Sequence, residues 1–116
     1  MIIKINNTKF NVKVLTTPEE RSEGMMFKTF SNDKNGMLFI MNENGKQDFW
    51  MKNCLVPLDM IFISFNEITK IHHNCKPCTK DCPTYSGNGN IVLEVKGGTC
   101  KKENIKIGDQ VTFLKS

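Results

Sequence analysis

The sequence contains no Ala, a single Arg and a single Trp. Ala is the strongest helix former, whereas Ile, Val, Phe and Thr, which favour strands, are plentiful, so we expect a mainly β fold. No apolar run approaches the ~20 residues that cross a bilayer, and the N-terminus lacks the apolar core and the cleavage site of a signal peptide. As written, the chain is expected to be cytoplasmic and to make no membrane contact.

The chain also lacks any concentration of positive charge. Its formal net charge is +4, but the lysines are scattered, and the longest cationic run is Lys101-Lys102. Nucleic-acid binding favours a strip of cations with Arg side chains and interleaved aromatic rings. We therefore expect the partner to be an unidentified small molecule or a protein, and not a nucleic acid.

The length and composition are those of an ordinary globular domain. The chain has 116 residues, of which 39% are hydrophobic. A chain of this size buries about two-thirds of its unfolded surface without needing cross-links. Since no repeat or linker interrupts it, we expect a single domain spanning residues 1–116.

The first 24 residues carry the clearest local signals. Residues 2–5 and 10–15 flank an Asn-rich turn, and the second segment alternates apolar and polar residues, which predicts a β-hairpin. Thr17 is placed to cap a helix, with Pro18 at its first position and Glu20 completing a capping box. We expect one short helix near residues 18–24, ending at Gly24.

The rest of the chain is typical of short strands joined by turns. Asn44-Gly45 suits a tight hairpin turn, and Asn66-Glu67 suits a second turn. Residues 74–90, rich in Cys, Pro, Gly and Asn, are expected to form a loop. The remaining strand candidates are residues 36–41, 48–51, 60–65, 68–73, 91–95 and 110–114. These signals predict a mainly β (β-rich α+β) fold: a small barrel or curled antiparallel sheet of about eight short strands with one short helix.

The segment from Asp48 to Asp59 combines the only Trp of the chain with charges and an amide between two apolar runs. One interpretation is structural, with Lys52 and Asp59 forming an ion pair around the turn at Pro57. The functional interpretation is a polar pocket that binds a small ligand, lined by Lys52, Asn53 and Asp59 with Trp50 as its apolar wall.

A group of cysteines follows the adjacent His72 and His73, and its spacing permits several chemistries. Three thiolates and one imidazole could hold zinc; the candidate ligands are Cys75, Cys78, Cys82 and His73. A disulfide between Cys78 and Cys82 would close a small ring, and free thiols in a loop are the simplest alternative. We expect no cofactor, with zinc in this loop as the alternative.

Several segments, in order along the chain, resemble an uncharacterised prokaryotic family catalogued as domain of unknown function 192. The resemblance implies a compact β-barrel-like domain with one short helix and implies no activity. Relatives often carry an export signal, and the match of Cys78 and Cys82 to the family pattern implies a loop staple in those relatives. The matching segments are Pro18-Glu-Glu-Arg21, Gly36-Met-Leu-Phe39, Phe49-Trp-Met-Lys-Asn53, Pro57-Leu-Asp59, Cys78 with Cys82-Pro-Thr-Tyr85, Val92-Leu-Glu94 and Ile107-Gly-Asp109.

The chain departs from the family pattern at residues 24–28, at Cys54, where Thr is common, and at Cys75, which lies outside it. The candidate ligand-binding residues are Trp50, Lys52, Asn53, Asp59 and Tyr85. We expect a small-ligand-binding or accessory domain without catalytic residues. The alternatives are a thiol- or metal-dependent enzyme using the Cys75–Cys82 loop, and a protein-interaction module.

Overall fold

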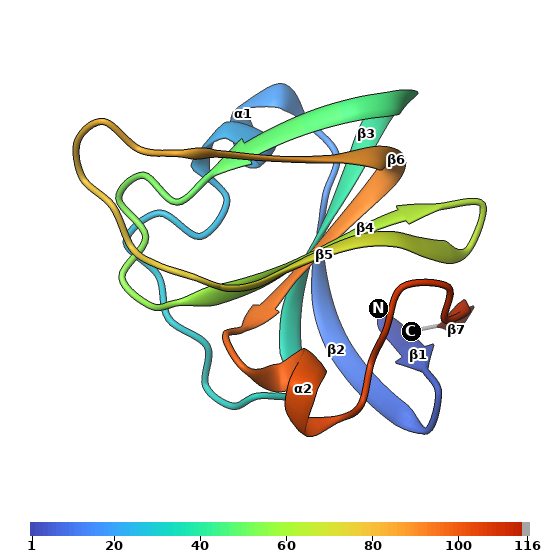
Figure 1. Ribbon diagram of the computed structural model, residues 1–116. Coiled ribbons are helices and arrows are strands. Elements are labelled where there is room, and N and C mark those ends of the chain that lie inside the picture. Colours follow the sequence, from blue (N-terminus) through green and yellow to red (C-terminus); the bar gives the residue numbers. More distant parts are fainter. Residues whose placement is uncertain (115–116) are drawn as a thin grey trace.

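The computed structural model describes residues 1–114 and is mainly β, as predicted. Seven strands form one sheet in the order β5-β4-β6-β3-β2-β1-β7 (Figure 1). Every neighbouring pair is antiparallel except β2 and β3, which run parallel with α1 as their crossover. The elements are β1 (Ile2–Ile5), β2 (Thr8–Leu15), α1 (Pro18–Glu23), β3 (Asn35–Trp50), β4 (Leu58–Ser64), β5 (Glu67–Cys75), β6 (Thr84–Lys96), α2 (Thr99–Lys102) and β7 (Val111–Leu114).

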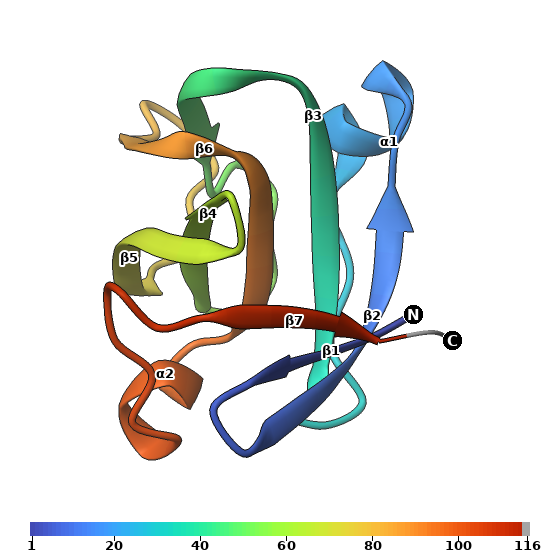
Figure 2. The ribbon, with the colours of Figure 1, turned by 90° about the vertical axis from the view of Figure 1, so that its right-hand side faces the viewer.

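The sheet curls until its two ends approach each other, giving a half-barrel. Glu67 at the start of β5 pairs with Gln110, immediately before β7. The Ile68 amide donates to the carbonyl of Asp109 at 3.0 Å, and the Gly108 amide donates to the carbonyl of Ile68 at 2.8 Å. Figure 2 shows the segment before β7 rising toward β5 at this point. These bonds satisfy backbone groups that an open sheet edge would leave unpaired.

Both faces of the central strands are buried, and each face has its own core. On β4, Ile61 and Ile63 pack into one cluster, while Met60 and Phe62 pack into the other. This alternation follows from the two-residue period of a strand. The second cluster lies on the α1 side, and it is unusually rich in thioethers: Met25, Met37, Met51 and Met60 are all buried in it.

The local predictions for the N-terminal region are confirmed. Thr17 caps α1: its side chain accepts from the Glu20 amide, and the Glu20 carboxylate accepts from the Thr17 amide at 3.1 Å, which completes the capping box. Hydrogen bonds from the backbone of Thr16 and Thr17 lower the pKa of Glu20. The helix ends at Gly24, where φ is +45°. The hairpin of β1 and β2 also forms, with a shorter turn at Asn6-Asn7 than expected.

The predicted hairpin turn at Asn44-Gly45 is wrong. Residues 35–50 form one long strand, with an irregularity in pairing between Ile40 and Gly45. The reason is that β6 is long enough to pair with both halves of β3. A local turn signal is therefore overridden by long-range pairing, and two expected strands merge into one.

The predicted loop over residues 74–90 is wrong in both its first and its last part. β5 continues to Cys75, and β6 already begins at Thr84. The glycines that suggested a loop instead allow β6 to pass close to β4. A Cβ atom at Gly87 would lie 2.5 Å from the ring of Phe62, and one at Gly89 would overlap the carbonyl of Ile63. The short helix α2 was also not predicted from the sequence.

Candidate functional site

A hollow of about 330 Å³ lies between α1 and the sheet, and we call it the α1 hollow. It is bounded by α1 and the residues after it, by the second half of β3, by residues 52–54 and by β6. Figure 1 shows α1 beside this end of β3 and β6. Its lining residues are Pro18, Arg21, Ser22, Glu23, Gly24, Met25, Met26, Phe39, Met41, Asp48, Phe49, Trp50, Lys52, Cys54 and Glu94.

Backbone contacts hold α1 in place as one wall of the hollow. The Arg21 guanidinium donates to the carbonyl of Thr16 at 2.6 Å and to that of Ile40, on β3, at 3.1 Å. After the helix, Met26 pairs with Cys54 as an isolated antiparallel bridge. A helix of six residues is too short to be stable alone, so these contacts to β3 and to residue 54 fix its position.

Aromatic rings line the hollow from β3. The rings of Phe39 and Phe49 meet edge to face, with their centroids 5.0 Å apart. Trp50 is 49% exposed at the mouth, and the Lys52 ammonium lies 5.2 Å from the centre of its ring. That distance is typical of a cation–π contact. The mouth of the hollow therefore has an aromatic surface with a cation above it.

Glu94 is the buried polar group of the α1 hollow. It lies on the same face of β6 as Val92, belongs to the hollow's lining and is only 3% exposed. Within residues 1–114 its carboxyl group has no hydrogen bond and no ion pair. Burial raises the pKa of this carboxyl to about 8, because the charged form loses its hydration and gains no partner.

Sequence reasoning did not single out Glu94 as a site residue. The usable signal was its position inside the apolar run Ile91-Val-Leu-Glu-Val95, which reads as a fully buried strand. An acidic residue inside such a run needs a partner or a functional reason. The run alone could not reveal that the carboxyl faces a hollow and not another side chain.

The charged residues around the mouth have partners outside the hollow. Glu23 pairs with Lys28 at 3.2 Å. The Asp48 carboxylate accepts from the Ser86 hydroxyl at 2.5 Å. Arg21 donates to backbone carbonyls. The hollow thus combines satisfied charges at its rim with an unsatisfied acid at its floor.

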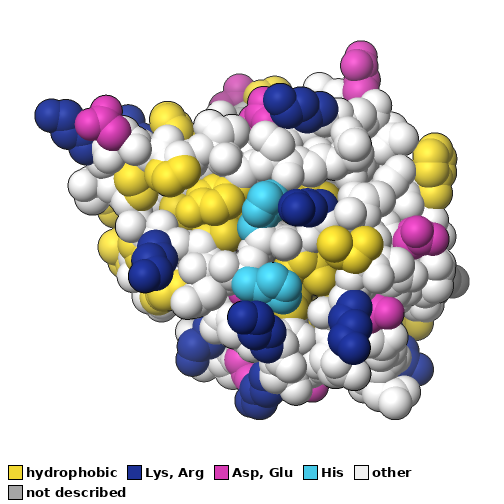
Figure 3. All heavy atoms as spheres, in the orientation of Figure 1, with side chains coloured by type: hydrophobic (Ala, Val, Ile, Leu, Met, Phe, Trp, Pro, Cys, Tyr) yellow, Lys and Arg dark blue, Asp and Glu magenta, His cyan; other side chains and the backbone are white. Residues whose placement is uncertain are grey.

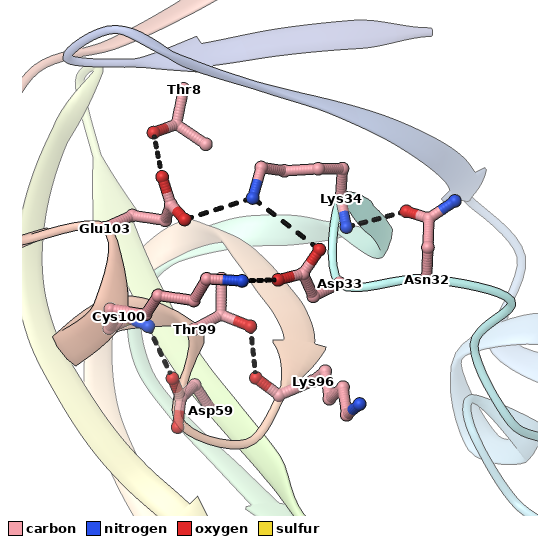
Figure 4. A network of polar contacts seen from close by, with 10 residues as sticks. Thr8, Asn32, Asp33, Lys34, Asp59, Lys96, Thr99, Cys100 and Glu103 are labelled. Carbon is pink, nitrogen blue, oxygen red and sulfur yellow. Dashed lines mark hydrogen bonds and ion pairs between the residues drawn. The ribbon is translucent and has the colours of Figure 1, made fainter.

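Asp59 does not belong to the α1 hollow, so the predicted grouping with Lys52 and Asn53 is wrong for this residue. Asp59 is fully buried, and its carboxylate accepts backbone N–H bonds from Asn74 at 2.7 Å, Gly98 at 3.1 Å and Cys100 at 2.8 Å. Figure 4 shows the Asp59 carboxylate accepting the hydrogen bond from the backbone of Cys100. The reason is strand parity, because Asp59 faces the opposite side of β4 from Met60.

Two other predicted ligand-binding residues lie near the hollow without lining it. Asn53 adopts a left-handed conformation with φ of +60°, and its backbone bonds with Cys78 and Phe27 at 2.8 Å each. Tyr85 faces Phe49 across β6 and β3 and meets the His72 ring edge to face at 5.4 Å. Of the five predicted residues, Trp50 and Lys52 are the ones in the lining.

The cysteine loop is closed by a disulfide between Cys78 and Cys82, whose Cα atoms are 5.6 Å apart. Cys75 is buried, and its thiol donates to the carbonyl of His72, while His73 is exposed. Within the part of the chain that the structure describes, no three His, Cys, Asp or Glu side chains are arranged to hold a metal ion. The alternative zinc set is therefore not assembled.

The face that carries β4 and β5 shows a mixed surface. Figure 3 shows both His side chains on this face, with Lys side chains dispersed around them and apolar patches between.

A network of ion pairs lies around α2. Lys102 pairs with Asp33 at 2.7 Å, and Lys34 pairs with Glu103 at 3.0 Å (Figure 4). Neither helix of the described chain is long and apolar enough to cross a membrane.

The chain is thus a small β protein, a curled half-barrel with a short helix beside its sheet. The chain belongs to the family domain of unknown function 192, described as an uncharacterized ACR, whose model matches residues 1–113. The resemblance seen in the sequence is thereby confirmed. No curated protein matches the chain.

Two of the crystal structures that share this fold align with nearly the whole chain. One is a proposed transcription regulator from Sinorhizobium meliloti 1021, with a TM-score of 0.88, 28% identity and coverage of 95% of this chain and 90% of that chain. The other is a protein of unknown function from Novosphingobium aromaticivorans DSM 12444, with a TM-score of 0.87, 30% identity and coverage of 97% and 84% respectively. The likeness supports the fold over nearly the whole chain.

Proposed function

We propose that this protein binds a small organic molecule in the α1 hollow. The observation that carries the proposal is the buried Glu94 carboxyl, which faces the hollow and has no partner among residues 1–114. Ligand pockets of proteins typically span about 300–1,000 Å³ and combine apolar walls with a few convergent polar groups. A hollow of about 330 Å³ with aromatic and thioether walls and one buried acid matches that description.

The thiols of the chain favour binding over a thiol-dependent reaction. A nucleophilic cysteine needs a lowered pKa, so that the thiolate is present at neutral pH. Burial instead raises the pKa of Cys54 to about 11 and that of Cys75 to about 12. Cys78 and Cys82 are held in the disulfide.

The only Trp of the chain gives a direct readout of binding, because Trp50 lies at the mouth of the hollow. We would titrate a panel of small amines, alcohols, carboxylic acids and sugars and follow Trp50 emission together with thermal stability. A ligand at a hundred times its Kd should stabilise the fold by about 2.7 kcal/mol.

Filling the hollow provides the decisive variant. Ser22 lies on α1 in the lining and is exposed, so Ser22→Phe should fill the hollow at little cost to the fold. Glu19→Phe, on the same helix but outside the lining, is the matched control. We expect Ser22→Phe alone to abolish binding; equal binding to both variants would refute a site in this hollow.

A variant of the disulfide distinguishes binding from the thiol alternative. Cys78→Ser removes the bond to Cys82 but leaves the lining of the hollow unchanged. Ligand affinity should remain within a few-fold of the parent protein. If the variant instead abolishes a turnover detected in the parent, the enzyme alternative is correct.

A further inference from the structure

Glu94 differs electrostatically from every other charged side chain that lines the α1 hollow. Arg21 donates to two backbone carbonyls, Glu23 pairs with Lys28, and Asp48 accepts from Ser86. Lys52 lies over the ring of Trp50. No cation within residues 1–114 pairs with the Glu94 carboxyl. A buried carboxylate without a counter-charge is costly, so a positive charge entering the hollow would be stabilised there.

The walls around Glu94 suit a cation with an apolar body. Aromatic faces attract cations through their quadrupole, and the position of Lys52 over Trp50 is an example at the mouth of this same hollow. The thioethers of Met25, Met26 and Met41 add polarisable and flexible surface to the lining. An apolar ligand body would contact these side chains while its charged end reached the floor.

We propose that the α1 hollow recognises an organic ammonium, a primary or secondary amine on a small apolar body, which pairs with the Glu94 carboxylate at its floor. This inference rests on the proposed ligand-binding function and specifies its ligand class. Trp50 and the thioether side chains contact the body of the ligand. Lys52 restricts access by like-charge repulsion and favours ligands that bring only one positive charge.

Binding of an ammonium is coupled to release of a proton. The empty hollow keeps Glu94 protonated at neutral pH, because burial raises the pKa of its carboxyl to about 8. When the ammonium binds, the carboxyl proton goes to solvent and the ion pair forms. The other ionisable groups that line the hollow are Arg21 and Glu23 from α1, Asp48 from β3, and Lys52 and Cys54 from the segment after it. The thiols of Cys54 and of Cys75, on β5, lie close enough to Glu94 for its charge to raise their pKa.

The test compares three probes that share one apolar body: 2-phenylethylamine, 2-phenylethanol and 3-phenylpropanoate. Binding is followed by Trp50 emission and by calorimetry between pH 6 and pH 9. The amine should bind at least about tenfold more tightly than the alcohol at pH 8, as a charged hydrogen-bonded pair allows. As the pH rises from 6 to 8, the Kd of the amine should fall by about tenfold per pH unit, because binding releases a proton. The Kd of the alcohol should stay constant over this range.

Two variants separate this recognition from a structural role of Glu94. Glu94→Gln keeps the shape of the side chain but should abolish both the preference for the amine and its pH slope. Lys52→Gln removes the nearby positive charge and should tighten binding of the amine relative to that of the alcohol. A merely destabilised hollow would weaken both probes, so Lys52→Gln keeps the proposal testable if Glu94→Gln fails to fold.

The outcomes distinguish this inference from the proposed function beneath it. Equal affinity for amine and alcohol, or preference for the carboxylate, overturns the ammonium inference. So does the absence of binding by all three probes in the millimolar range. The proposed function stands in each of these cases if another ligand is lost specifically in Ser22→Phe, and it fails if no ligand is.

Discussion

A carboxyl group enclosed by apolar side chains makes the stability of a fold depend on pH. The pKa of Glu94 rises from 4.5 to about 8 on folding because of burial. Between these two values the folded chain binds more protons than the unfolded chain, so stability falls as pH rises. The contribution of Glu94 is fully favourable below pH 4.5 and is lost progressively up to about pH 8.

Glu94→Gln should remove this pH dependence. The neutral amide has nearly the same shape, so we expect similar stability to the parent near pH 5 and greater stability above pH 8, by on the order of 4 kcal/mol. Urea unfolding between pH 5 and pH 9 measures the difference. The exposed Glu43→Gln is the control and should follow the parent profile. A parallel profile for Glu94→Gln would contradict the account of its burial.

Asp59 has a structural role, and its substitution should affect stability more than binding. Asp59→Ala would leave three backbone donors, at Asn74, Gly98 and the buried Cys100, without their acceptor, which should cost about 3 kcal/mol. Asp59→Asn keeps one acceptor oxygen and should have an intermediate cost. Chemical denaturation measures both variants. Ligand affinity of the folded Asp59→Asn protein should be unchanged; a selective loss of affinity would place Asp59 back in the site.

The strand β6 depends on glycine where it passes close to β4. Gly89→Ala would force a methyl group against the backbone carbonyl of Ile63, which cannot move without disturbing the pairing of β4 with β6. We expect a loss of stability of about 3 kcal/mol, at the upper end for overpacking. The neighbouring exposed Asn88→Ala should change stability by less than about 0.5 kcal/mol. Equal effects of the two variants in denaturant unfolding would show that β6 has room to shift.

The elements differ in how well the sequence alone specifies them. The helix α1 was predictable because the residues that start and stop it lie in its first turn or next to its ends. They are Thr17, Pro18, Glu20 and Gly24. The length of β3 was not predictable, because its second half is set by pairing with a strand about 40 residues further along the chain. Gly87 and Gly89 gave a loop signal, since glycine marks a turn and a close approach of backbones equally well in sequence.

The strand order of the whole sheet predicts a gradient of local stability. β6 is hydrogen-bonded on both sides, to β3 and β4, whereas β7 pairs with β1 at the end of the sheet. Amides opened only by global unfolding should therefore lie in β3, β4 and β6, and those of β7 should exchange at lower free energies. Native-state hydrogen exchange measures this directly. Protection of β7 equal to that of β6 would show that the contact between Glu67 and Gln110 closes the barrel completely.

The sequence by itself determined the mainly β class, the helix cap, the first hairpin and the family resemblance. These features follow from composition, from interactions between residues a few positions apart and from short motifs. For the candidate site, the sequence identified Trp50 and Lys52, because a lone Trp beside a charge is conspicuous in any context.

Only the tertiary structure decided which polar groups meet. It separated Asp59 from Lys52, because successive residues of a strand point to opposite faces of the sheet and Asp59 therefore faces away from the side of Met60. It also brought Glu94 under α1 and left its carboxyl unpaired in a hollow. That arrangement depends on how β3 and β6 pair and on where the helix docks, and no local pattern encodes the distance between them.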